Sequence, residues 1–179
     1  MSEAIDLVSG RVHRFGNHVN TDAILPGRYL ALRNPAELGA HCLENLDPGF
    51  RERVRLGDIL VGGRNFGTGS SREQAVIALK AVGIRAIVVA SAARIFFRNA
   101  INLGLPVLTC PDAAAALQAG DPATVSVTGG FIEQGGMRWT AQPLDGEVCA
   151  ILSCGGLIAR TRQILSQSLP ANNMVRADG

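Results

Sequence analysis

The chain has 179 residues, with 17 lysines and arginines against 15 aspartates and glutamates, so its formal net charge is only +2. A charge this small argues against nucleic-acid and anionic-membrane partners, which bind through strongly basic surfaces. Hydrophobic residues make up 47% of the chain and glycines number 21, which excludes disordered and fibrous proteins and favours an α/β protein rich in small residues.

The first ten residues lack the basic start and apolar core of a secretion signal, and no apolar run approaches the roughly 20 residues of a membrane-spanning helix. We therefore expect a cytoplasmic protein. The cysteines are far apart and form no C-x-x-C pair, which predicts reduced core residues and no metal or cluster site in this chain. They are Cys42, Cys110, Cys149 and Cys154.

The N-terminal part of the chain begins with a predicted strand over residues 10–16. An irregular loop rich in Asn, Asp, Gly and Pro follows over residues 18–30. Pro35 suits the first turn of a helix over residues 35–44, and the Asp-Pro-Gly sequence at residues 47–49 ends it.

The middle of the chain alternates strands and helices. A strand, a helix closed by a glycine, an apolar strand, a helix capped by Ser91 and a final strand are predicted over residues 57–63, 70–83, 84–90, 91–104 and 106–110. This β-α-β-α-β order predicts parallel strands joined by right-handed crossovers. The continuous apolar run of the second strand predicts a sheet covered on both faces.

The last third of the chain contains a short alanine-rich helix, which we expect Asp112 to cap, and a hairpin region over residues 124–141. The C-terminal segment is predicted to form one helix broken at Gly155-Gly156, or two short helices. Residues 169–179 are expected to form a flexible tail.

The most informative segment is residues 63–73, GRNFGTGSSRE, between a predicted strand and a predicted helix, where α/β sheets place their ligands. Its glycines allow a tight turn and a close approach to a ligand. Ser70 and Glu73 have the spacing of a capping box, and the helix start that they would fix favours an anion. Arg72 opposes the helix dipole but suits bidentate carboxylate binding. From local chemistry alone, an ordinary N-cap serine beside a solvated arginine remains equally open.

Two nucleotide-binding patterns do not fit this segment. A Walker A loop places a lysine before its serine or threonine, and no lysine precedes Ser70-Ser71. The dinucleotide fingerprint needs a third glycine where Arg72 stands, and an arginine there would obstruct the pyrophosphate.

Residues 65–75, NFGTGSSREQA, resemble the N-F-G-x-G-S-S-R-E-[HQ]-A signature of the swivelling domain of the aconitase superfamily. Three further stretches resemble that family in order and spacing: residues 20–30 (NTDAILPGRYL), residues 93–104 (ARIFFRNAINLG) and residues 155–157 (GGL). The resemblance extends from about Gly10 to Leu157, which is most of the chain.

The resemblance implies an α/β fold: a single swivelling β/β/α domain over residues 1–179, with a core of about 10–160 and a partly parallel sheet flanked by helices. It also implies a hydro-lyase that removes water from a hydroxy acid and returns it at the neighbouring carbon, with a 4Fe-4S cluster as Lewis acid. Because this chain lacks suitable cysteines, the cluster is expected on a separate large subunit. This chain would then be active only in a heterodimer or heterotetramer.

The family's motif also implies roles for residues of the central segment. Ser70 matches the catalytic base, which acts as an alkoxide and needs nearby positive charge because a serine hydroxyl is a very weak acid. Arg72 matches a ligand of a substrate carboxylate, while Ser71 and the backbone around Gly69 would help to hold an oxyanion.

The loop after Tyr29-Leu30 faces the variable substituent of the substrate in the family's small-subunit enzymes. Homoaconitase-type proteins carry an arginine directly after this pair, whereas this chain has Ala31 and Leu32. Apolar residues suit an alkyl group and disfavour an unpaired carboxylate. The favoured function is therefore the interconversion of 2-isopropylmalate and 3-isopropylmalate in leucine biosynthesis. Arg33 keeps homoaconitase-type and dimethylmalate-type substrates open, since it lies close enough in sequence to reach the substituent.

Two further alternatives follow from the sequence. Arg94 and Arg98, one helical turn apart, favour a partner-facing role or an ion pair over catalysis. From a different functional class, the chain could be a non-catalytic module that holds a free anion at the predicted helix start, and such a module would tolerate the loss of the Ser70 hydroxyl.

Overall fold

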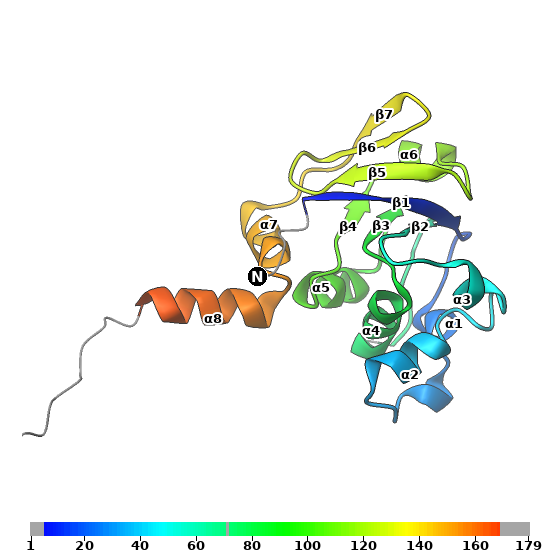
Figure 1. The fold of residues 1–179 in the computed structure, drawn as a ribbon, viewed down its shortest axis with the longest axis horizontal. Helices are drawn as coiled ribbons and strands as arrows, with labels where there is room; N and C mark the ends of the chain where they lie inside the picture. Colours follow the sequence, from blue (N-terminus) through cyan, green and yellow to red (C-terminus); the bar gives the residue numbers. More distant parts are fainter. Residues whose placement is uncertain (1–5, 71, 169–179) are drawn as a thin grey trace, which may run out of the picture.

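A seven-stranded mixed sheet forms the centre of the computed structural model, which describes residues 6–70 and 72–168 (Figure 1). The strands are arranged in the order β4-β3-β2-β1-β5-β6-β7, so β1 joins a parallel half to an antiparallel half. Their bounds are Leu7–Arg14 for β1, Ile59–Gly62 for β2, Ala86–Val89 for β3, Val107–Thr109 for β4, Pro122–Ser126 for β5, Phe131–Gln134 for β6 and Met137–Thr140 for β7.

The parallel half consists of β1 to β4, and α4 (Glu73–Val82) and α5 (Arg94–Asn102) connect its last three strands. This arrangement confirms the predicted β-α-β-α-β unit. Every residue of β2 and β3 is buried. Neighbouring residues enter opposite cores, because Leu60 packs with α4 whereas Ile59 packs with α6 (Pro111–Ala116). The sheet is thus covered on both faces, as predicted.

The antiparallel half is built by β5, β6 and β7 on the other edge of β1. Gly135 and Gly136 join β6 to β7 with φ values of 59° and 81°, which suit a tight hairpin turn and confirm the predicted hairpin. In β1, a Cβ on Gly10 would lie 2.2 Å from the Gly57 carbonyl oxygen, so only glycine fits where these backbones cross.

The segment before α4 contains more helix than the sequence predicts. The expected irregular loop holds α1 (Thr21–Ile24), which the Asn20 side chain caps, and a 3-10 helix (Gly27–Tyr29). In contrast, α2 (Pro35–Ala40) ends four residues before the predicted position and turns follow it. Leu43 has a φ of 60°, which a right-handed helix does not accommodate. The short helix α3 (Phe50–Arg53) precedes β2.

Two predicted helix caps are wrong. Ala93, not Ser91, occupies the position before α5, because the Ser91 hydroxyl instead accepts a hydrogen bond of 2.9 Å from the Asn65 N–H. Cys110 occupies the position before α6, and Asp112 lies inside its first turn without a side-chain cap. The α5 helix therefore begins later than the local pattern indicates, because the contact with Asn65 occupies Ser91, whereas α6 begins one residue before Asp112.

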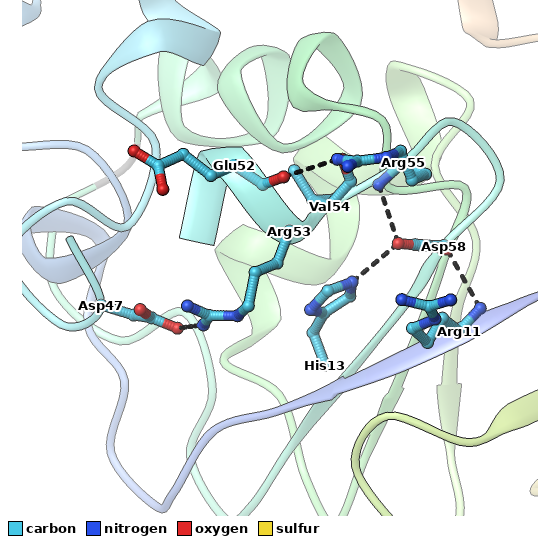
Figure 2. Close-up of polar contacts among 8 residues, drawn as sticks. All are labelled: Arg11, His13, Asp47, Glu52, Arg53, Val54, Arg55 and Asp58. Atoms are coloured by element: carbon cyan, nitrogen blue, oxygen red, sulfur yellow. Dashed lines mark hydrogen bonds and ion pairs between the residues drawn. The ribbon is translucent and has the colours of Figure 1, made fainter. Parts of the chain in front are cut away.

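A buried hydrogen bond between His13 and Asp58 ties β1 to the turn before β2 (Figure 2). His13 Nε2 lies 2.7 Å from Asp58 Oδ2, with side chains only 9% and 6% exposed. Asp58 also accepts hydrogen bonds from the backbone N–H groups of Arg55 and Arg11, at 2.8 and 3.0 Å. Burial alone would raise the pKa of Asp58, but these three hydrogen bonds outweigh it and hold the pKa below its ordinary value.

The C-terminal segment forms two helices, α7 (Gly146–Ser153) and α8 (Leu157–Ser168), which confirms the predicted break at two glycines. A Cβ on Gly104 would lie 2.3 Å from the carbonyl oxygen of Gly155, so the end of α5 and this break are in close contact. In Figure 1, α8 extends away from the sheet. The predicted tail, residues 169–179, lies outside the described residues.

Among the described residues, no single helix is long and apolar enough to cross a membrane. The helices α7 and α8 meet that criterion only when taken together, and they are bent by 94° at the break between them.

Candidate functional site

The loop after β2, residues 63–70, is shaped by left-handed backbone. Asn65, Gly67 and Gly69 have φ values of 55°, 76° and 101°. A Cβ on Gly67 would lie 2.1 Å from Cγ of Phe96 on α5, so both the backbone angle and the available space require glycine there. The loop can therefore lie directly against α5.

The chain around α1 holds this loop from one side. The Gly67 N–H donates to the Val19 carbonyl at 2.7 Å, and the Thr21 N–H donates to the Thr68 carbonyl at 2.8 Å. The Thr21 hydroxyl donates to the Ser70 carbonyl at 3.0 Å. These bonds fix the backbone of the serine that the sequence singled out as the base.

The segment before α5 holds the loop from the other side. The Phe66 N–H donates to the Ser91 carbonyl at 2.9 Å, and the Ala93 N–H donates to the Phe66 carbonyl at 2.8 Å. The rings of Phe66 and Phe96 pack edge to face, with centroids 5.3 Å apart. Three stretches that the sequence analysis treated separately therefore meet around one loop.

The predicted capping box at the start of α4 is wrong. The helix begins at Glu73, three residues after the predicted cap, and Arg72 occupies the N-cap position with φ −136° and ψ 104°. Because the backbone of Ser70 is bonded to Thr21, it does not turn into the helix. The Ser70 hydroxyl is left without a capping role, which removes the ordinary N-cap alternative.

A cavity of about 390 Å³ lies between this loop, α1 and α5. Three predicted site residues, Gly69, Ser70 and Arg72, line it. Two residues of α5, Arg94 and Arg98, line it as well. No aspartate or glutamate is among its described lining residues, so the wall around the serine is positively charged.

Arg72 does not behave as a solvated surface arginine. Its side chain is 15% exposed, and its Nη1 donates to Oδ1 of Asp22 on α1. This pair directs the guanidinium along the cavity wall and leaves further N–H donors for a ligand carboxylate. The predicted site residue Ser71 lies outside the described residues.

The predicted substituent loop lies apart from this cavity. Ala31, Leu32 and Arg33 are not among its lining residues. Leu32 packs against the core, while Ala31 and Arg33 are exposed. The loop follows Tyr29, whose ring stacks on His41 with centroids 3.7 Å apart. A contact of these three residues with the substrate stays a prediction.

Arg94 and Arg98, for which the sequence favoured a partner-facing role or an ion pair, also line the cavity. Both are exposed, and within residues 6–70 and 72–168 neither side chain makes an ion pair or a hydrogen bond. The proposed ion pair is therefore not formed among the described residues. Their i, i+4 spacing on one helix could be read from the sequence, whereas the packing of α5 against the serine loop, which brings them to the cavity, could not.

The described residues offer no obvious metal site. No group of three or more His, Cys, Asp and Glu side chains gathers closely enough to hold an ion. Cys42 and Cys110 are buried, and burial raises the pKa of the Cys42 thiol far above its usual range. Because thiolates, not thiols, bind metals, Cys42 is a poor ligand.

Comparison with known proteins confirms the resemblance to the aconitase family. Residues 14–113 match the family of the aconitase C-terminal domain. The chain is 47% identical over 152 residues to the 3-isopropylmalate dehydratase small subunit of Heliobacterium modesticaldum, covering 84% of this chain and 92% of that one. It is also 44% identical over 151 residues to the 2,3-dimethylmalate dehydratase small subunit of Eubacterium barkeri, covering 83% and 93%.

A solved structure agrees with these relatives. The crystal structure of 3-isopropylmalate dehydratase (LeuD) from Methanocaldococcus jannaschii superimposes with a TM-score of 0.84 at 41% identity, covering 90% of this chain and 98% of that one. This likeness confirms the predicted mixed α/β fold. The chain belongs to the aconitase C-terminal domain family and, within it, to the dehydratase small subunits.

Proposed function

We propose that this chain is the small subunit of a 3-isopropylmalate dehydratase and isomerises 2-isopropylmalate and 3-isopropylmalate together with a large subunit. The observation that carries the proposal is one cavity wall. In it, Ser70, whose hydroxyl does not cap α4, lies with Arg72, Arg94 and Arg98, and no carboxylate is among the described lining residues. Such a wall suits an anionic substrate whose carbon-bound proton must be removed.

In the proposed reaction, the Ser70 alkoxide takes the proton from the carbon next to a substrate carboxylate. The electron pair of that C–H bond forms the carbon–carbon double bond, while the C–O bond of the substrate hydroxyl breaks and the leaving hydroxide takes a proton from an acid group of the assembled enzyme to depart as water. Rehydration at the neighbouring carbon reverses these steps. Nearby cations, here Arg72 and the arginines of α5, favour the negatively charged form of a weak acid such as serine.

The small subunit supplies only part of this site. Ser70, Arg94 and Arg98 are exposed, so nothing in residues 6–70 and 72–168 excludes water from the reacting atoms. The 4Fe-4S cluster of the proposed large subunit would supply Lewis acidity toward the substrate hydroxyl. Turnover is thus expected only from the assembled enzyme.

The substrate assignment rests on the loop after Tyr29. Ala31 and Leu32 place no charge where homoaconitase-type enzymes carry an arginine, which favours an alkyl substituent. A dimethylmalate is the second candidate, since a dimethylmalate dehydratase subunit is nearly as similar to this chain as the isopropylmalate enzymes are.

A direct test mixes this chain anaerobically with its cluster-loaded large subunit and follows the ultraviolet absorbance of the unsaturated intermediate. Isopropylmalate, homocitrate or homoisocitrate, and dimethylmalate are compared. We expect turnover of isopropylmalate from the mixture and from neither subunit alone. Preference for another acid would change the substrate but keep the reaction.

The Ser70→Ala variant separates the enzyme from a non-catalytic anion-binding module. Loss of the base should lower turnover by at least about 100-fold, while circular dichroism and subunit association stay unchanged. Ser166→Ala is the matched control, because Ser166 is exposed on α8, its hydroxyl donates to the Gln163 carbonyl, and it is not among the residues that line the cavity. Equal activity of both variants and the wild-type protein would overturn the assignment of Ser70.

A further inference from the structure

Helix α8 exposes a band of apolar side chains. Four of the nine exposed large hydrophobic residues in the described part of the chain lie on this helix, with exposed fractions between 41% and 69%. Leu157, Ile164 and Leu165 have the i, i+7, i+8 spacing of a single helix face, and Ile158 lies two turns before Leu165 on its edge. We call these four residues the α8 apolar face.

The direction of α8 is fixed although most of its surface is exposed. In Figure 1 it extends away from the sheet, and its contacts are mainly with α7 and α5. Arg160 donates to the Glu147 carboxylate on α7 at 3.2 and 3.3 Å. A Cβ on Gly156 would lie 2.7 Å from the Asn102 carbonyl oxygen, so the junction before α8 packs tightly against the end of α5. These contacts hold an arm about 18 Å long away from the core of the protein.

Such an arm is unfavourable in water without a partner. A helix of 12 residues is only marginally stable unless it packs an apolar face against another element. Within residues 6–70 and 72–168, the α8 apolar face stays exposed. Contiguous exposed apolar surface on a soluble protein usually marks a site of protein–protein interaction. We therefore consider which protein surface would cover it.

A second copy of this chain fits the α8 apolar face poorly. An antiparallel pair of α8 helices centred on Thr161 would match Leu157 with Leu165 of the other copy, but it would also place the two Arg162 side chains, one from each copy, beside each other. A stable interface also needs about 20–30 residues on each side, more than the 12 residues of α8 supply. The face is thus too small for a dimer and suits one part of a larger interface.

The charge of α8 indicates the chemistry of that larger surface. The helix has no aspartate or glutamate from Leu157 to Ser168. Arg162 lies at the border of the apolar face, is exposed, and takes part in no ion pair within the described part of the chain. The complementary surface is an apolar groove with a carboxylate at its rim.

We propose that the α8 apolar face docks into an apolar groove of the large subunit, with an acidic side chain of that subunit opposite Arg162. This inference rests on the proposed function, which supplies the large subunit. Because α8 packs on α5, and α5 also lines the cavity beside Ser70, docking of the arm would fix the serine loop relative to the rest of the active site.

The test measures the affinity of this chain for its cluster-loaded large subunit by anaerobic isothermal titration calorimetry. The variants are Ile158→Gln, Leu165→Gln and Arg162→Gln. The matched control is Ala159→Gln, because Ala159 is exposed on the opposite side of the same helix. Circular dichroism and urea unfolding of the isolated chain establish that each variant folds.

We expect Ile158→Gln and Leu165→Gln each to raise the dissociation constant by about 10-fold or more, since each loses apolar burial and places an amide in an apolar groove. Arg162→Gln should weaken binding and reduce its dependence on salt, and Ala159→Gln should change neither. At saturating large subunit, all four should reach the turnover number of the wild-type enzyme, because none of these residues lines the cavity.

Three results would overturn the inference. The first is an affinity of Ile158→Gln and Leu165→Gln for the large subunit equal to that of Ala159→Gln. The second is a wild-type chain that dimerises alone in analytical ultracentrifugation and becomes monomeric in Ile158→Gln, which would assign the face to a second copy. The third is a loss of stability of the isolated chain in Ile158→Gln but not in Ala159→Gln, which would show that the chain covers the face itself.

Failure of the proposed function gives a different pattern. The wild-type subunits would then associate, and the variants of the α8 apolar face would weaken that association, but no hydroxy acid would be turned over by any of the assemblies.

Discussion

Replacing Asp58 by asparagine removes one negative charge from the most buried polar contact between β1 and the turn before β2. The Asp58 carboxylate accepts three hydrogen bonds, from the His13 ring and from the backbone N–H groups of Arg55 and Arg11. An asparagine has the same shape but only one acceptor oxygen, so its amide nitrogen must face at least one of these donors. The substitution therefore tests the hydrogen bonds without creating a cavity.

The expected magnitude follows from those contacts. A hydrogen bond to a charged group contributes about 1.5–3 kcal/mol, and a buried donor left without a partner costs about 1–3 kcal/mol. Because asparagine retains one acceptor, we expect Asp58→Asn to lower the free energy of unfolding by about 2–4 kcal/mol. Asp47→Asn is the matched control: Asp47 pairs with Arg53, which is 56% exposed, and an exposed pair contributes less than about 1 kcal/mol.

Urea unfolding followed by circular dichroism measures both variants at neutral pH and in acid. Because the folded-state pKa of Asp58 is lowered, its contribution is fully present above the ordinary aspartate pKa of about 3.9. The contribution is lost as the pH falls through the lowered folded-state value, so the difference between wild-type protein and Asp58→Asn should shrink in acid. A loss no larger than that of Asp47→Asn, or a difference that grows on acidification, would refute the reasoning.

Two further predictions concern the glycine loop and the thiols. Gly67→Ala should lower the free energy of unfolding by about 2–5 kcal/mol, because alanine would have to adopt a left-handed backbone and would clash with Phe96. Gly120→Ala, with φ 87° and no neighbour within 4 Å, should lower it by only about 1–2 kcal/mol. Equal losses of stability in urea unfolding would contradict the clash. Alkylation of the folded protein, analysed by mass spectrometry, should modify the two partly exposed cysteines first and the two buried ones only after unfolding. Early labelling of Cys42, whose pKa is raised by burial, would contradict the structure. The early pair is Cys149 and Cys154, and the late pair is Cys42 and Cys110.

The parts of the fold that the sequence predicted are those with strong local patterns. The strand at Ala86–Val89 is apolar throughout because both faces of the sheet are covered, and the turn at Gly135-Gly136 needs two residues that tolerate positive φ. The resemblance to the family also depended on a contiguous sequence motif, chiefly residues 65–75.

The errors arose where a distant contact outweighed a local signal. Ser70 and Glu73 satisfy the spacing of a capping box, and such a cap contributes about 1 kcal/mol. The bonds that Thr21 makes to Thr68 and Ser70 keep the backbone out of the helix, so α4 starts at Glu73. In the same way, Ser91 does not cap α5 as predicted, because its hydroxyl accepts a hydrogen bond from the Asn65 N–H.

By itself, the sequence determined the order of strands and helices from β2 to β4, the burial of the parallel strands and the presence of a serine and an arginine suited to carboxylate chemistry. Only the tertiary structure decided that Thr21, Ser70, Arg94 and Arg98 share one cavity, that Arg72 is paired, and that the loop at residues 31–33 lies outside the cavity wall. The physical reason is that periodicity and turn chemistry act over a few residues, whereas this site is assembled by hydrogen bonds and packing between segments tens of residues apart.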